Sequence, residues 1–104
     1  MESFVKQSLL YDFYGDLLTE HQRDVYGAYV LDNLSLAEIS AEFGISRQGV
    51  HDIIKRSNTA LEEYEEKLSL VEKFLNIKEM VGRIKNCSDL KEAQSIADDI
   101  INQL

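Results

Sequence analysis

Proline is absent from this chain of 104 residues, and no glycine-serine linker or low-complexity tract interrupts it. Long runs of alternating apolar residues, which would predict strands, are also missing. Helices are therefore the natural elements, and the 44% apolar content is enough for a single helical core. We predict an all-α protein that forms one compact domain.

Cysteine is nearly absent, since Cys87 stands alone and can form no internal disulfide. Such sparing use of cysteine is typical of a reducing compartment. No stretch approaches the about 20 apolar residues of a membrane span. The first residues lack the basic region and apolar stretch of a signal peptide. We expect a cytoplasmic protein with no membrane span.

Catalytic and metal-binding patterns are missing as well. The sequence has no glycine-rich phosphate loop, no nucleophile elbow and no cysteine-histidine pairing. His21 and His51 lie in different expected helices, without the spacing that zinc ligands need. The carboxylates between Glu62 and Glu66 point in several directions from a helix, so we interpret them as a solvated face. We expect no enzyme activity, no metal and no cofactor.

The most informative segment is residues 35–56, SLAEISAEFGISRQGVHDIIKR, which has the spacing of a helix-turn-helix. Ser35 and Glu38 form the capping box S-x-x-E, which starts a short helix. Gly44 can adopt the left-handed conformation that ends this helix. Ser46 can then cap a second helix. The segment therefore predicts two helices, of which the second is presented to a partner.

The second helix of this motif has two distinct faces. Its inward row is Val50, Ile54, Ser57 and Leu61. The residues that we predict to bind nucleic acid or another partner lie on the outer face, and they are Arg47, Gln48, His51, Lys55 and Arg56. Arg47 suits a guanine edge or a phosphate, and Gln48 suits an adenine edge. Asp52 lies on the same face, and a carboxylate is repelled by phosphates.

The charge balance opposes strong binding to DNA. The chain carries 11 basic and 19 acidic residues, a formal charge of −8, whereas nucleic-acid binding draws much of its affinity from lysine and arginine. The acidic excess lies outside residues 35–60, so the outer face of the motif keeps a small positive charge. We expect DNA binding that is at most weak and sensitive to salt.

The helices outside the motif supply a core and an excess of apolar surface. A front helix over residues 3–14 ends at Gly15, and its aromatic side chains close the core. Because residues 57–85 contain neither proline nor a capping signal, we expect the second helix of the motif to continue through several turns. Ser88 caps a last helix, which covers part of the apolar surface.

The remaining apolar surface predicts a homodimer through the C-terminal helices. The residues that we assign to the dimer interface are Leu68, Val71, Phe74, Leu75, Ile77 and Val81. We accordingly divide the chain into a helix-turn-helix bundle, residues 1–60, and a C-terminal helical extension, residues 61–104. The alternative is a compact monomer in which the C-terminal helices fold onto the front helices.

Two resemblances extend this interpretation. The segment LTEHQRDVYGAYVLDNLSLAEISAEFGISRQGV, with its L-T-x-x-Q-R opening, resembles the promoter-contacting helix-turn-helix domain of bacterial sigma factors. The stretches YDFYGDLLT, SRQGVHDIIKR and LEEYEEKLSL resemble the bacterial YlxM family, and this similarity spans residues 8–75. The fold that these resemblances imply is a sigma-region-4-like helix-turn-helix bundle, followed by a long helix and a C-terminal helix.

The YlxM resemblance also implies a function. It points to a regulatory protein of the signal recognition particle (SRP) pathway, with the SRP RNA or the SRP GTPase as its partner. The helix-turn-helix is equally compatible with a DNA-binding transcriptional regulator that reads a major groove. A protein-protein interaction module is the third alternative, and the sequence does not choose among the three.

Overall fold

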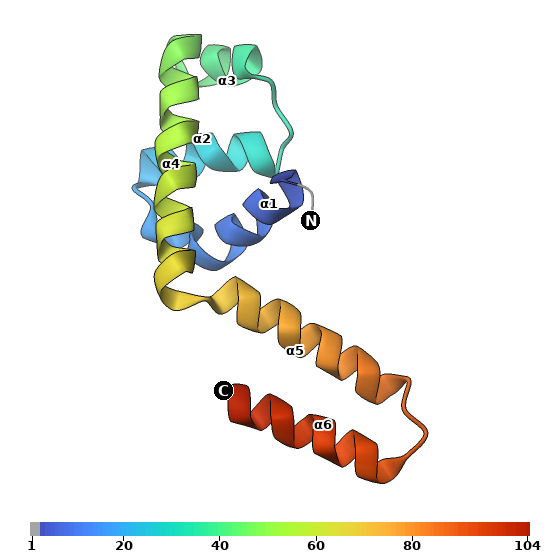
Figure 1. Ribbon diagram of the computed structural model, residues 1–104. Coiled ribbons are helices and arrows are strands. Elements are labelled where there is room, and N and C mark those ends of the chain that lie inside the picture. The colour runs from blue at the N-terminus through green and yellow to red at the C-terminus, as the bar shows by residue number, and fades with distance from the viewer. Residues whose placement is uncertain (1–2) are drawn as a thin grey trace. The chain divides into compact units, whose positions relative to one another are not determined.

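A computed structural model describes residues 3–104, and in this range the chain is helical and contains no strand (Figure 1). The elements in chain order are α1 (Ser3–Tyr14), the 3₁₀ helix η1 (Gly15–Leu17), α2 (Glu20–Val30), α3 (Leu36–Phe43), α4 (Arg47–Leu68), α5 (Leu70–Lys85) and α6 (Leu90–Gln103). The predicted all-α class is thereby confirmed. The contacts divide the chain into two compact units, one that ends at Leu68 and one formed by Ser69–Leu104.

The two units meet at Ser69, where the backbone leaves the helical conformation. Ser69 has a φ of 54°, in the left-handed region. The motif's second helix continues for several turns past Arg56, as expected, but it ends at Leu68 and does not reach Lys85, because a separate helix, α5, begins at Leu70. A left-handed residue other than glycine is uncommon and costs on the order of 1–3 kcal/mol. The units consequently divide at Ser69, whereas the sequence had suggested a division after residue 60.

The capping signals of the motif form the predicted hydrogen bonds. The Ser35 hydroxyl accepts from the Glu38 N–H at 3.1 Å, and the Glu38 carboxylate accepts from the Ser35 N–H at 3.1 Å. Gly44 ends α3 with a φ of 67°. The Ser46 hydroxyl accepts from the Gly49 N–H at 3.0 Å at the start of α4. These contacts determine how α3 leads into α4.

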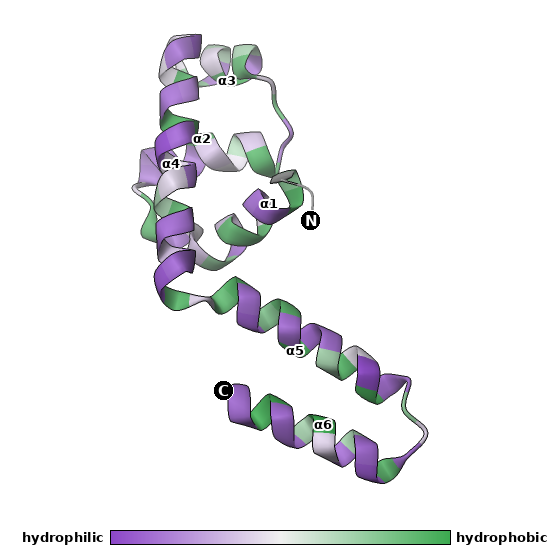
Figure 2. Cartoon of the chain, viewed as in Figure 1, coloured by the Kyte–Doolittle hydropathy of each residue, from purple (hydrophilic) through white to green (hydrophobic). Residues whose placement is uncertain are grey.

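The core of the first unit surrounds the inward face of α4, which packs against α1, α2 and α3. Val50, Ser57 and Leu61 are fully buried and Ile54 is partly buried, as the inward row predicts. The other fully buried side chains are Leu10, Tyr14, Val25, Tyr26 and Ile39. Figure 2 shows that hydrophilic residues occur along much of α4.

Tyrosine hydroxyls tie the front helices to one another and to α4. Tyr11 donates to the Arg23 carbonyl at 3.0 Å, and Tyr26 donates to the Asn58 side-chain oxygen at 3.0 Å. Of the aromatic side chains of α1, Tyr14 is buried, but Phe4 and Phe13 are exposed by 40% and 37%, so the expectation that the aromatics of this helix close the core is correct only in part.

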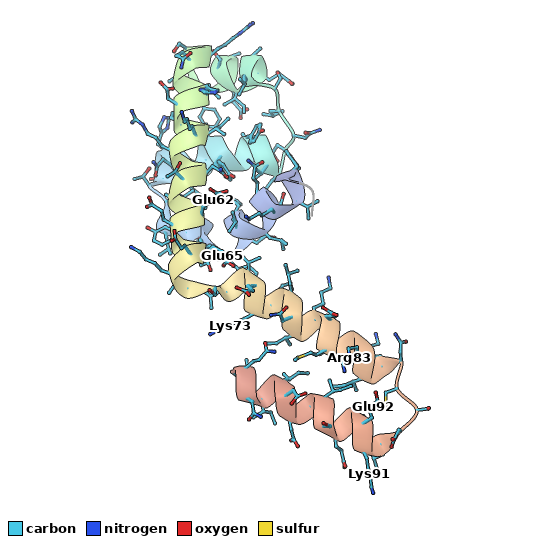
Figure 3. All side chains as sticks on the ribbon, viewed as in Figure 1. Glu62, Glu65, Lys73, Arg83, Lys91 and Glu92 are labelled. Atoms are coloured by element: carbon cyan, nitrogen blue, oxygen red, sulfur yellow. The ribbon has the colours of Figure 1, made fainter. Side chains whose placement is uncertain are left out.

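One acidic residue departs from the prediction of a solvated face. Glu65 is only partly exposed, and its carboxylate accepts a hydrogen bond of 2.6 Å from the Tyr14 hydroxyl. Glu62, one turn earlier in α4, is exposed, and both residues are labelled in Figure 3. The two carboxylates differ because a buried tyrosine from α1 lies within reach of only one of them.

The second unit is a hairpin of α5 and α6, which pack against each other. Asp89, and not the expected Ser88, caps α6, since its carboxylate accepts from the Lys91 N–H at 3.0 Å. Val71 and Ile96 are the buried apolar side chains of this unit. Exposed charges flank the hairpin, including Lys73 and Arg83 on α5 and Lys91 and Glu92 on α6 (Figure 3). Along the described part of the chain, no helix combines the length and apolarity that crossing a membrane requires.

Candidate nucleic-acid interface

The candidate interface lies on the first half of α4, the second helix of the helix-turn-helix. The five residues that the sequence assigned to it, Arg47, Gln48, His51, Lys55 and Arg56, are all exposed. They are held outward because Val50, Ser57 and Leu61 on the opposite side of the same helix are buried against the bundle. The caps at Ser35 and Ser46 then set where α4 begins. Local hydrogen bonds and core packing together orient this surface.

The three permanent cations of the interface are not engaged within the protein. Neither Arg47, Lys55 nor Arg56 forms an ion pair with any residue between 3 and 104. A guanidinium or ammonium group that is exposed and unpaired can replace counterions at a phosphate without first breaking an internal contact. These three side chains are therefore available to an anionic partner.

Two of the polar residues are connected to the neighbouring carboxylate. The Gln48 amide nitrogen donates to Asp52 Oδ1 at 3.0 Å, and His51 Nδ1 lies 3.7 Å from the same oxygen. We did not predict the hydrogen bond between Gln48 and Asp52 from the sequence, although residues spaced by one helical turn often form such a pair. To bind the edge of an adenine, the Gln48 amide must therefore first break its hydrogen bond to Asp52.

A hollow of about 500 Å³ continues the candidate interface along α4. Its lining residues all belong to this helix and are Asp52, Lys55, Arg56, Thr59, Ala60 and Glu63. Because Asp52 and Glu63 lie beside the cations, the positive region is short. This surface suits contact with a few phosphates and does not form a long basic groove.

The residues assigned to dimerisation are distributed over both units. Leu68, Phe74 and Val81 are exposed by 47%, 42% and 43%, whereas Val71 is 5% exposed. Leu75 and Ile77 are partly exposed. Leu68 is the last residue of α4 and belongs to the first unit, while the other five lie in the α5–α6 hairpin.

Residues 3–104 contain no cluster of three or more histidine, cysteine or acidic side chains that could hold a metal. The Cys87 thiol lies 3.1 Å from the carbonyl of Asp89, to which it donates.

Comparisons with known proteins agree with this architecture. A family model described as "Putative helix-turn-helix protein, YlxM / p13 like" matches residues 1–101. A UPF0122 protein of Caldanaerobacter subterraneus is 49% identical over 86 residues, which cover 83% of this chain and 74% of the relative. A UPF0122 protein of Halalkalibacterium halodurans is 47% identical over 95 residues, covering 91% and 86%. A third, from Bacillus cereus, is 48% identical over 85 residues, covering 82% and 77%. The chain therefore belongs to the UPF0122 family of YlxM-like helix-turn-helix proteins.

Proposed function

We propose that this protein is a non-enzymatic regulator that binds nucleic acid through the outer face of α4. The observation that carries the proposal is that three cations, Arg47, Lys55 and Arg56, lie on the exposed second helix of a helix-turn-helix and form no ion pair with any residue from 3 to 104. A helix placed in this way is the element that enters a groove in this class of motif. Bacterial nucleic acid lies in the cytoplasm, so a cytoplasmic location is part of the proposal.

The charge of the chain favours a ribonucleoprotein over bare DNA as the partner. With a formal charge of −8, the protein as a whole is repelled by phosphates, and only the α4 face is locally positive. A ribonucleoprotein offers both phosphates for the cations and a basic protein surface for the carboxylates. The resemblance to YlxM proteins supports the same choice. We therefore propose that the partner is the SRP RNA, or that RNA assembled with the SRP GTPase, in preference to a DNA operator.

A salt titration of binding tests the α4 face. Purified protein is titrated against labelled random duplex DNA, the SRP RNA, and this RNA assembled with the SRP GTPase. Arg47→Ala and Lys55→Ala should each weaken binding, and each lost phosphate contact should reduce the slope of log affinity against log salt by about 0.7 to 0.9. Lys91→Ala, an exposed lysine on α6, is the matched control and should change neither quantity. Unchanged affinity and slope in both α4 variants would contradict the proposal.

Selectivity among the three ligands identifies the partner. Tighter binding to either particle form than to DNA at physiological salt would support an SRP accessory. Binding to duplex DNA alone, with a steep salt dependence, would support the transcriptional alternative. Binding to the assembled particle that does not depend on Arg47 or Lys55 would instead indicate an interaction module that uses another surface.

We also propose that the protein dimerises through its α5–α6 hairpin. The unit Ser69–Leu104 is shorter than the about 40 residues below which a fold usually needs outside support. Val81, Leu90 and Ile101 of this unit are exposed by 43%, 72% and 66%. Two such hairpins related by a twofold axis can form a four-helix bundle that buries these side chains. A dimer would also double the number of α4 cations that reach one nucleic acid.

Sedimentation at high micromolar concentration tests the dimer. The unaltered protein should sediment as a dimer, and Val81→Asp should convert it to a monomer because the interface would have to bury a carboxylate. Val5→Asp provides the matched control, since Val5 is exposed by 49% on α1 of the other unit. A monomer for the unaltered protein would remove the dimer proposal.

A further inference from the structure

A second recess lies within the first unit, beside the candidate interface but separate from the hollow along α4. It has a volume of about 350 Å³ and is lined by residues of α1, α2, α3 and α4. This volume is near the lower end of the about 300–1,000 Å³ typical of small-ligand sites. The recess is therefore suited to one compact group and not to an extended segment.

Three of the residues that line the recess are apolar or aromatic. Tyr29, Leu36 and Ile54 line it, and each is partly exposed. The Tyr29 ring is held by two neighbours, with the Phe4 ring centroid at 5.9 Å and the Tyr26 centroid at 6.3 Å. A ring that is positioned in advance loses little conformational freedom when a flat ligand packs against it.

Two side-chain amides, Gln7 and Asn58, also line the recess. The Asn58 oxygen is already used, because it accepts the hydrogen bond from the buried Tyr26 hydroxyl. This contact fixes the orientation of the amide and leaves its NH₂ group as a donor. Within residues 3–104 the Gln7 amide has no hydrogen-bond partner. The site thus offers an oriented donor together with a group that can both donate and accept.

One cation, Lys55, stands at the same recess. Lys55 and His51 line it from α4, and Lys55 also lines the hollow along the outer face of that helix. A ligand in the recess would therefore be joined to the phosphate-binding face through one shared lysine. The combination of an aromatic wall, amide groups and an adjacent cation matches the chemistry of a nucleotide, in which a flat base with polar edges is attached to a phosphate.

We propose that this recess binds a single unpaired nucleobase of an RNA, with the adjoining phosphate at Lys55. The inference rests on the proposed function of α4 and specifies the form of nucleic acid that is preferred. In a duplex the bases are stacked and paired, so none can enter a recess without being extruded. Loops and bulges of RNA present unstacked bases that proteins bind by stacking and by hydrogen bonds to their edges. The recess therefore selects an RNA with unpaired nucleotides over a continuous duplex.

Nuclear magnetic resonance with nucleoside monophosphates tests occupancy directly. AMP, GMP, CMP and UMP are each titrated at millimolar concentration, and the side-chain NH₂ signals of Gln7 and Asn58 are followed. At least one monophosphate should shift both signals in a saturable manner. The matching nucleoside, which lacks the phosphate, should bind more weakly because it loses the contact with Lys55. If none of the four shifts either amide, the inference is wrong.

Competition between two RNAs tests selectivity. The ligands are a hairpin with an unpaired loop and a blunt RNA duplex with the same number of phosphates. The unaltered protein should prefer the hairpin by about tenfold, the range expected for one stacked base. Gln7→Leu should reduce this preference by about fivefold, as for one lost hydrogen bond, while Gln94→Leu on α6 is the matched control. Tyr29→Leu, with its fold checked by circular dichroism, should reduce the preference further.

The outcomes separate this inference from the function on which it rests. If Gln7→Leu and Tyr29→Leu retain the full hairpin preference while Lys55→Ala weakens both RNAs, the recess proposal fails and the α4 face stands. If Gln7 matters only for the RNA assembled with the SRP GTPase, the recess holds a protein side chain and the inference is overturned. If neither RNA responds to Arg47→Ala or Lys55→Ala, the proposed function itself fails.

Discussion

Replacing Leu61 with alanine should lower the free energy of unfolding of the first unit by about 3 kcal/mol. Leu61 is 0% exposed on the inward face of α4, the helix against which α1, α2 and α3 all pack. Truncation removes apolar contacts and leaves a cavity that three surrounding helices cannot easily collapse to fill. The expected loss is a large part of the total stability of a small domain.

Urea denaturation followed by tyrosine fluorescence measures this effect in the relevant unit. The chain has five tyrosines, all of which precede Ser69, and the sequence contains no tryptophan. The signal therefore reports on the first unit alone. Leu31→Ala is the matched control, since Leu31 is 58% exposed and its truncation should change stability by less than about 0.5 kcal/mol. Equal midpoints for Leu61→Ala and the unaltered protein would show that the packing around α4 is not as described.

The stability of the first unit should fall steeply above pH 10, and Tyr26 should account for much of this loss. Burial raises the pKa of the Tyr26 hydroxyl well above its usual value of 10.0, with smaller contributions from Tyr29 and Glu62. Because the folded pKa exceeds the unfolded one, the stabilisation is fully present below pH 10. Above that pH the unfolded chain ionises first, and stability falls by about 1.4 kcal/mol per pH unit for this one group.

Tyr26→Phe removes the ionisable hydroxyl and keeps the packing of the ring. At neutral pH this variant should be less stable by about 1 kcal/mol, because the hydrogen bond to Asn58 is lost. Above pH 10 it should lose stability more slowly than the unaltered protein, so the two curves should converge. Some dependence on pH will persist, since burial also raises the pKa of Tyr11. Far-UV circular dichroism is the suitable measurement, and parallel curves for the two proteins would contradict the prediction.

Features that depend on residues close together in the chain were predicted correctly. The capping box of Ser35 and Glu38, the left-handed Gly44 and the cap at Ser46 each involve groups within four residues of one another. The inward row of α4 follows from helical periodicity in the same way. The family resemblance also rests on these segments, and the family match over residues 1–101 confirms it.

Two features were predicted wrongly from local sequence patterns: where α4 ends and the exposure of Glu65. The absence of proline suggested that one helix would run from the motif toward Lys85, yet the backbone becomes left-handed at Ser69 and a new helix starts there. Glu65 was grouped with the solvated carboxylates, but its hydrogen-bond partner Tyr14 is 51 positions away in the sequence. Ser69 and Glu72 do have the S-x-x-E spacing of a helix start, whereas the Tyr14 contact has no signature in the residues around Glu65.

The sequence by itself determined the class of the protein, where the two helices of the helix-turn-helix begin, and the outer face of α4, because capping and helical periodicity are set within one or two turns. Only the tertiary structure decided that Arg47, Lys55 and Arg56 have no ion-pair partner in the described part of the chain, and that Gln7, Tyr29, Leu36 and Asn58 line one recess. Those four residues come from four different helices. Their meeting depends on how the helices pack around a shared core, which no pattern within a single helix encodes.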